Sequence, residues 1–153
     1  MGNLGSFTFL GQTTGVKTFA PILIVLALTS IYGLWYRTSR GKIRSGKHAG
    51  LHAGLSRALQ SQELGARATF VQFSSAFCTP CRATRTLLQS VVSDFPDLRH
   101  IEIDAEAHLE LVRELGIHST PTTLILDARG SEVGRAVGAP KRDQVLLALS
   151  AIV

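Results

Sequence analysis

Residues 68–82 read ATFVQFSSAFCTPCR. The first seven, 68–74, are rich in β-branched and aromatic residues and are long enough for one buried strand. Two cysteines follow, Cys78 and Cys81, and after them apolar residues recur at helical spacing as far as Pro96. The stretch therefore predicts a buried strand, a short turn that carries both cysteines, and a helix.

Outward from this stretch, the sequence alternates between helical and strand patterns, with Gly and Pro at the boundaries. A strand, a crossover helix and a second strand form a parallel pair, whereas two strands joined by a tight turn are antiparallel. We therefore expect an α/β fold with a mixed central sheet and helices on both faces. The expected elements are helix 51–59, strand 68–74, helix 83–95, strand 100–103, helix 109–115, strands 122–126 and 131–137, and a helix around 145–149.

Charge is unevenly spread along the 153 residues, which carry a net charge of +5. Residues 1–60 hold seven basic residues and no acid, whereas residues 61–153 hold nine basic and eleven acidic residues. A nucleic-acid-binding domain needs a basic face on its folded part, so no nucleic-acid partner is expected. Two cysteines are too few for a small disulfide-stapled fold, and 45% hydrophobic residues exclude a disordered chain.

An uncharged run of nineteen residues lies between Lys17 and Arg37. As a helix it would rise about 28 Å, close to the roughly 30 Å of a bilayer core. We expect a transmembrane helix over 19–36 that contacts membrane lipid, preceded by an N-terminal tail, 1–18. A cleaved signal peptide and a buried core helix are the alternatives, but a signal peptide begins with basic residues, and residues 1–16 contain no Lys or Arg.

Five basic residues follow the run, within residues 37–50, which also hold three glycines. We interpret residues 37–50 as a basic linker to a folded domain over 51–153. Because basic residues that flank a span tend to stay in the cytoplasm, we expect a single-pass protein of the cell membrane with this domain on the cytoplasmic side.

The two cysteines lie between a predicted strand and the helix after it. At a helix start, unpaired amides and the helix dipole favour an anion, so Cys78 should react readily as a thiolate. Cys81, one turn later, is within reach of Cys78 for a disulfide and should be more enclosed. Half of a zinc site and two unrelated buried cysteines are the alternatives. Zinc needs four ligands, and the sequence offers no second pair, so no metal is expected.

Two segments, FVQFSSAFCTPCR (70–82) and IHSTPT (117–122), resemble the two signatures of the thioredoxin family. The resemblance implies a thioredoxin-like fold, Cys78 as the nucleophile and Cys81 as the resolving thiol. It also implies a cis bond before Pro121 and chemistry without a cofactor. The residues that it implies in substrate binding are Phe77, Thr79, Pro80, Thr120 and Pro121.

The sequence departs from the family pattern at several positions. Phe77 replaces the usual Trp, and Thr79 replaces the usual Gly. Gln72 matches a buried Asp, and His100 matches a Lys that often accompanies that Asp. A carboxamide cannot take the proton of Cys81, so water, His100 or the leaving thiolate must manage it. Gln72 and His100 are therefore candidates in proton handling, with purely structural roles as the alternative.

These observations predict a membrane-tethered thiol–disulfide oxidoreductase that reduces disulfide-containing proteins and is recharged by a dithiol protein or a reductase. A disulfide oxidase, isomerase or cytochrome-maturation protein outside the cytoplasm is one alternative. The other is a binding module that uses the same fold without turnover.

Overall fold

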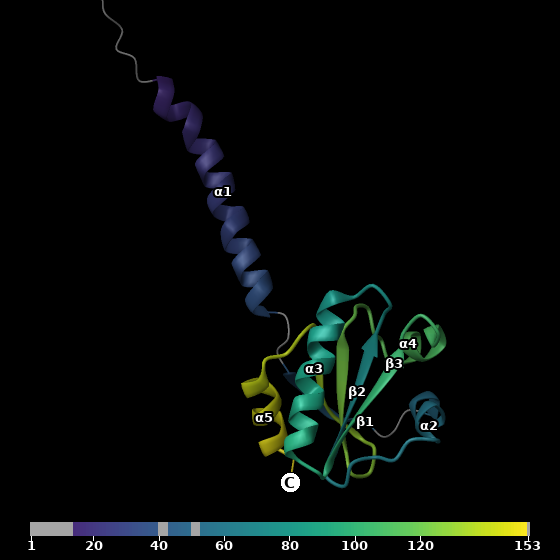
Figure 1. Ribbon diagram of the computed structural model, residues 1–153. Helices are drawn as coiled ribbons and strands as arrows, with labels where there is room; N and C mark the ends of the chain where they lie inside the picture. Colours follow the sequence, from purple (N-terminus) through teal and green to yellow (C-terminus); the bar gives the residue numbers. More distant parts are fainter. Residues whose placement is uncertain (1–13, 40–42, 50–52, 153) are drawn as a thin grey trace, which may run out of the picture. The chain divides into compact units, whose positions relative to one another are not determined.

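The computed structural model describes residues 14–39, 43–49 and 53–152 (Figure 1). The chain divides into two compact units, residues 1–38 and 39–153, which are described separately.

The first unit contains a long helix, α1 (Thr14–Ser39), and its large apolar side chains between Ile22 and Tyr36 are exposed. Thr29 lies in its apolar part, and the hydroxyl of Thr29 donates to the carbonyls of Val25 (2.9 Å) and Leu26 (3.0 Å). A polar group is thereby satisfied within the helix. The rings of Tyr32 and Tyr36 stack one turn apart, with centroids separated by 6.1 Å.

Within the residues that the structure describes, no helix is both long enough and apolar enough to cross a membrane. The transmembrane helix expected over 19–36 falls inside α1 and stays a prediction. Most of the expected N-terminal tail lies outside the described residues.

The second unit is a five-stranded mixed sheet in the order β1-β5-β4-β2-β3. β2 and β3 are parallel, as the crossover helix between them predicts, and β4 is antiparallel to both β2 and β5. The strands are β1 (Ile43–Ala49), β2 (Ala68–Ser74), β3 (Leu98–Asp104), β4 (Thr122–Asp127) and β5 (Glu132–Val137). The helices are α2 (Ala53–Leu59), α3 (Thr79–Asp94), α4 (Leu109–Glu114) and α5 (Arg142–Ser150).

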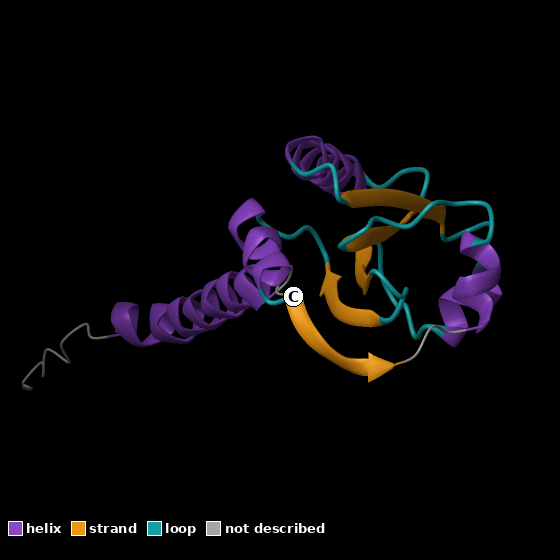
Figure 2. Cartoon of the chain, turned by 90° about the horizontal axis from the view of Figure 1, so that it is seen from below, coloured by secondary structure: helices purple, strands orange, loops and turns teal. Residues whose placement is uncertain are grey.

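Helices cover both faces of this sheet (Figures 1 and 2). Phe70 and Ile125 are buried in one core with residues of α3 and α5, and Phe73 and Leu124 in the other with residues of α2 and α4. Burying one such side chain contributes roughly 1.5–3 kcal/mol. β2 is buried along its whole length, and its side chains contribute to both cores.

The structure corrects the expected basic linker. Residues 37–50 are not a plain tether, because β1 (Ile43–Ala49) pairs antiparallel with β5 along the sheet edge. The compact unit accordingly begins at Ser39 rather than at residue 51. A strand is paired by its backbone, so a basic, glycine-containing segment can occupy an edge although its side chains show no strand periodicity.

Candidate active site

The two cysteines lie at the junction between β2 and α3. Cys78 is the N-cap residue of α3, and a disulfide joins it to Cys81, with the two Cα atoms 5.2 Å apart. The amide of Cys81 also donates to Cys78 Sγ at 3.1 Å. Pro80 lies in the first turn, where a missing N–H costs little. The sulfur of Cys78 therefore faces the positive end of the helix dipole, as expected.

Burial distinguishes the two sulfurs. Cys81 is only 2% exposed, whereas Cys78 is half-buried. An incoming sulfur atom thus reaches Cys78 more easily, and the expectation that Cys81 is the more enclosed cysteine is confirmed.

A second loop lies beside the cysteine turn. The bond between Thr120 and Pro121 is cis, as the resemblance implies. The hydroxyls of Ser75 and Thr120 lie 3.2 Å apart and join this loop to the residues that precede Cys78. The carbonyl of Pro121 accepts from the amide of Gly138 at 2.8 Å. Two segments far apart in sequence are thereby brought to one site.

The residues expected to bind substrate differ in exposure. Phe77 is fully exposed, and Thr79 and Pro80 are also on the surface. Thr120 is half-buried and Pro121 is buried. Their part in substrate binding stays a prediction.

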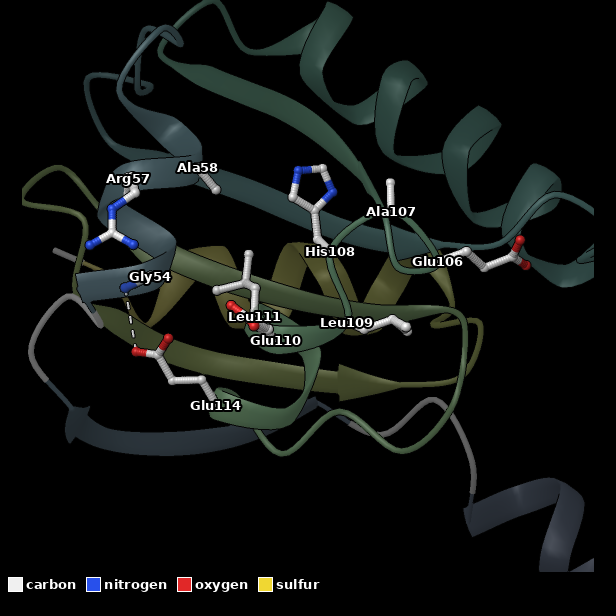
Figure 3. A pocket seen from close by; sticks show the side chains of 10 residues that line it. All are labelled: Gly54, Arg57, Ala58, Glu106, Ala107, His108, Leu109, Glu110, Leu111 and Glu114. Carbon is white, nitrogen blue, oxygen red and sulfur yellow. Dashed lines mark hydrogen bonds between the residues drawn. The ribbon is translucent and has the colours of Figure 1, made fainter.

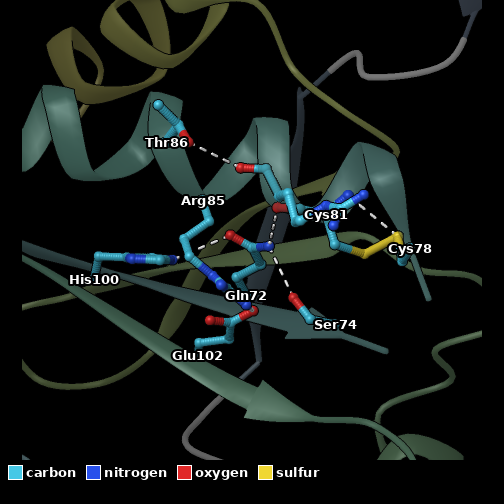
Figure 4. A network of polar contacts seen from close by, with 9 residues as sticks. Gln72, Ser74, Cys78, Cys81, Arg85, Thr86, His100 and Glu102 are labelled. Atoms are coloured by element: carbon cyan, nitrogen blue, oxygen red, sulfur yellow. Dashed lines mark hydrogen bonds and ion pairs between the residues drawn. A yellow bond between two sulfur atoms is a disulfide. The ribbon is translucent and has the colours of Figure 1, made fainter. Parts of the chain in front are cut away.

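Gln72 lies beneath the cysteines and is fully buried (Figure 4). Its Nε2 donates to the carbonyl of Cys81 (2.9 Å) and to Ser74 Oγ (2.8 Å). Its Oε1 lies 3.1 Å from His100 Nε2, which donates because a carboxamide oxygen only accepts. Gln72 therefore fixes the first turn of α3 to β2, and its carboxamide has partners on both sides.

An ion pair borders this network. Arg85 Nη2 and Glu102 Oε1 lie 2.5 Å apart (Figure 4). Burial alone would raise the pKa of Glu102, but hydrogen bonds from Arg85 and Ser74 bring this pKa below its usual value. Burial lowers the pKa of His100, and the nearby Glu102 does not offset that effect. His100 is thus held in its neutral form more firmly than a free histidine.

Sequence reasoning did not find Ser74, Arg85 and Glu102. Two regular spacings in the sequence could have identified these three residues. Side chains two apart in a strand share a face, which places Ser74 with Gln72 and Glu102 with His100. Arg85 follows Cys81 by four residues, one helical turn. These spacings do not show that the three residues meet Gln72. That requires the β2–β3 register, which pairs Gln72 with Glu102.

One cavity of the folded unit adjoins the cysteines, and another does not. One, of about 370 Å³, is lined by both cysteines together with residues of β3 and α3. The other, of about 570 Å³, lies between α2 and α4 and contains neither cysteine (Figure 3). Among the described residues, no group of three His, Cys, Asp or Glu side chains is placed to hold a metal ion.

Comparison with known proteins agrees with this geometry. Residues 56–151 match the Thioredoxin family. Thioredoxin H2-1 of Oryza sativa subsp. japonica is 31% identical over 71 residues, which cover 46% of this chain and 51% of that protein. The thioredoxin of Chlamydia muridarum is 30% identical over 80 residues, which cover 52% of this chain and 78% of that protein. The chain thus spans about half the length of the rice protein.

A solved structure shows the same fold. The crystal structure of thioredoxin NaTrxh from Nicotiana alata superposes with a TM-score of 0.54 and covers 70% of this chain and 98% of its own. The two sequences are 22% identical, so this likeness concerns the fold alone.

The lowered pKa of His100 predicts how stability depends on pH. Unfolded histidine has a pKa near 6.5. As pH falls from 7 to 5, the unfolded state takes up the proton first, so the free energy of unfolding decreases, by at most about 1.4 kcal/mol per pH unit for one proton. Urea unfolding in a pH series measures this slope.

His100→Gln, which keeps an N–H donor for Gln72, should flatten the slope over this pH range. His118→Gln, at an exposed position, is the matched control and should leave it unchanged. Parallel curves for the wild type and His100→Gln would show that His100 does not contribute.

Proposed function

The chain belongs to the thioredoxin family, and we propose that it reduces disulfide bonds in proteins with the dithiol of Cys78 and Cys81. One observation carries the proposal. A half-buried sulfur at the N-cap of α3 forms a disulfide with a buried sulfur one turn later, beside a loop that contains a cis proline.

The greater exposure of Cys78 than of Cys81 supports Cys78 as the attacking cysteine. The thiolate of Cys78 attacks a substrate disulfide and expels one substrate thiolate, which leaves a mixed disulfide. The thiolate of Cys81 then attacks Cys78 Sγ, expels the second substrate thiolate and closes the Cys78–Cys81 disulfide. Two electrons pass to the substrate, and each released thiolate takes up one proton.

The surface around Cys78 is suited to an extended substrate segment. Phe77 supplies a fully exposed apolar ring next to the nucleophile. The backbone of Thr120 directly precedes the cis proline and β4, and we expect a substrate strand to pair with it there. Thr79 and Pro80 border the same surface.

Gln72 takes no proton in this scheme, because its carboxamide is held by His100, Ser74 and Cys81. The thiolate released from the substrate is a stronger base than a carboxamide, and we propose that it or water accepts the Cys81 proton. His100 then acts as a positioning residue, because its Nε2 bonds to Gln72.

The oxidised pair must be reduced again before another turnover. The sequence of steps needs neither a metal nor an organic cofactor, so a second dithiol protein or a reductase is the expected donor. The reducing direction fits a cytoplasmic location, where thiols are kept reduced.

We also propose that α1 anchors the chain to a membrane through residues 19–36, with the folded domain in the cytoplasm. Two features support this: the run of nineteen uncharged residues, and the exposed apolar side chains between Ile22 and Tyr36. The basic residues that follow the run favour this orientation. An anchored domain encounters membrane-bound partners more often than a free one.

Reduction of insulin by the full chain in detergent, with dithiothreitol as electron donor, tests the catalytic proposal. Cys78→Ser should abolish the activity because it removes the attacking thiolate. Cys81→Ser, reduced and then freed of dithiothreitol before insulin is added, should accumulate a mixed disulfide with the substrate, visible on a non-reducing gel. Wild-type activity no higher than that of Cys78→Ser would favour a binding module instead.

A topology assay tests the anchor. The full chain should sediment with membranes and resist alkaline carbonate extraction, whereas a chain without residues 19–36 should remain in the supernatant. A reporter that is active only outside the cytoplasm, fused to the C-terminus, should be inactive. Strong reporter activity would instead place the domain outside and favour an oxidase, an isomerase or a cytochrome-maturation protein.

A further inference from the structure

The 370 Å³ cavity beside the cysteines has the size of a small-molecule site. Both cysteines line it, and the rest of its lining comes from the end of β2 and the loop after it (74–76), the first turns of α3 and the C-terminal end of β3. A molecule in this cavity would therefore lie against the reactive pair, on the side of the site formed by β3.

The lining of the cavity carries basic side chains from one element and acidic side chains from another. Arg82 and Arg85 line it from α3, and Glu102 and Asp104 line it from β3. Arg85 and Glu102 already form an ion pair across it (Figure 4). That pair neutralises one charge of each sign and leaves the guanidinium of Arg82 and the carboxylate of Asp104.

These two groups have few partners of their own. Arg82 Nη2 donates to Thr79 Oγ1 at 3.4 Å, a long hydrogen bond. Asp104 Oδ1 accepts from the amide of Glu106 at 2.8 Å, within its own loop. In the part of the chain that the structure describes, neither Arg82 nor Asp104 belongs to an ion pair.

We propose that this cavity binds a small disulfide bearing α-amino acid groups, with a carboxylate at Arg82 and an ammonium at Asp104, and that the Cys78–Cys81 dithiol reduces it. A purely anionic ligand would meet Asp104, and a purely cationic one would meet Arg82, so a zwitterion fits both walls best. The inference rests on the proposed function and adds a second substrate class to it.

The reaction balances with the groups already named. Cys78 thiolate attacks one sulfur of the small disulfide and expels one amino-acid thiolate. Cys81 thiolate then attacks Cys78 Sγ and expels the other, so that one disulfide is consumed and one is formed. Both released thiolates take protons from water, and two electrons pass from the protein to the ligand.

Four small disulfides test the charge preference: L-cystine, the cation cystamine, the anion 3,3′-dithiodipropionate and the neutral 2-hydroxyethyl disulfide. The full chain, reduced and held in detergent, is mixed with each disulfide, and thiol release gives kcat/KM. Each value is divided by the rate with dithiothreitol, which removes differences in intrinsic reactivity. L-cystine should exceed 2-hydroxyethyl disulfide by about tenfold, the size expected for charge-assisted contacts.

Two conservative variants locate the preference. Arg82→Gln should lower the normalised rate with L-cystine to that with cystamine, and Asp104→Asn should lower it to that with 3,3′-dithiodipropionate. Arg129→Gln, a control at a position 87% exposed in the turn between β4 and β5, should leave all ratios unchanged.

The outcomes separate this proposal from the one it rests on. If the chain reduces insulin but reduces L-cystine no more than twofold faster than the neutral disulfide, the cavity proposal is overturned and the proposed function stands. A preference for L-cystine that survives both Arg82→Gln and Asp104→Asn also overturns it. If neither insulin nor any small disulfide is reduced, the proposed function fails as well.

Discussion

The first turn of α3 is the constraint on which the whole site depends. It directs the amide of Cys81 at the sulfur of Cys78, and it places the positive end of a 16-residue helix at that sulfur. The turn is held to the sheet from below, because Gln72 Nε2 donates to the carbonyl of Cys81 at 2.9 Å. That hydrogen bond fixes the position of the cysteine turn relative to β2.

Periodicity predicted most of the folded unit. β2 and α3 were recognisable because fully buried strands and amphipathic helices leave strong patterns, and the parallel pairing of β2 with β3 follows from the helix between them. β1 could not be predicted in the same way. Its sequence, IRSGKHA, shows no alternation, and only the unpaired backbone edge of β5 explains why it is a strand.

The sequence predicted those site residues that lie within short local motifs. Cys78, Cys81 and Pro121 were assigned from two short segments, and the structure places those segments side by side through the Ser75–Thr120 contact. The polar groups around them were not found, because Arg85 and Glu102 meet only through the packing of α3 on β3. Gln72 is the clearest case. The resemblance to the family showed that it replaces an acid, and the structure shows that its amide bonds to Ser74 and to the carbonyl of Cys81.

The central claim is that α3 makes Cys78 the reactive thiol and shields Cys81. Alkylation of the reduced full chain with limiting iodoacetamide, quantified for each cysteine by mass spectrometry at pH 7, measures this directly. The account predicts that Cys78 is modified at least about tenfold faster than Cys81, and that urea removes the difference. Equal rates in the folded protein, or faster modification of Cys81, would contradict it.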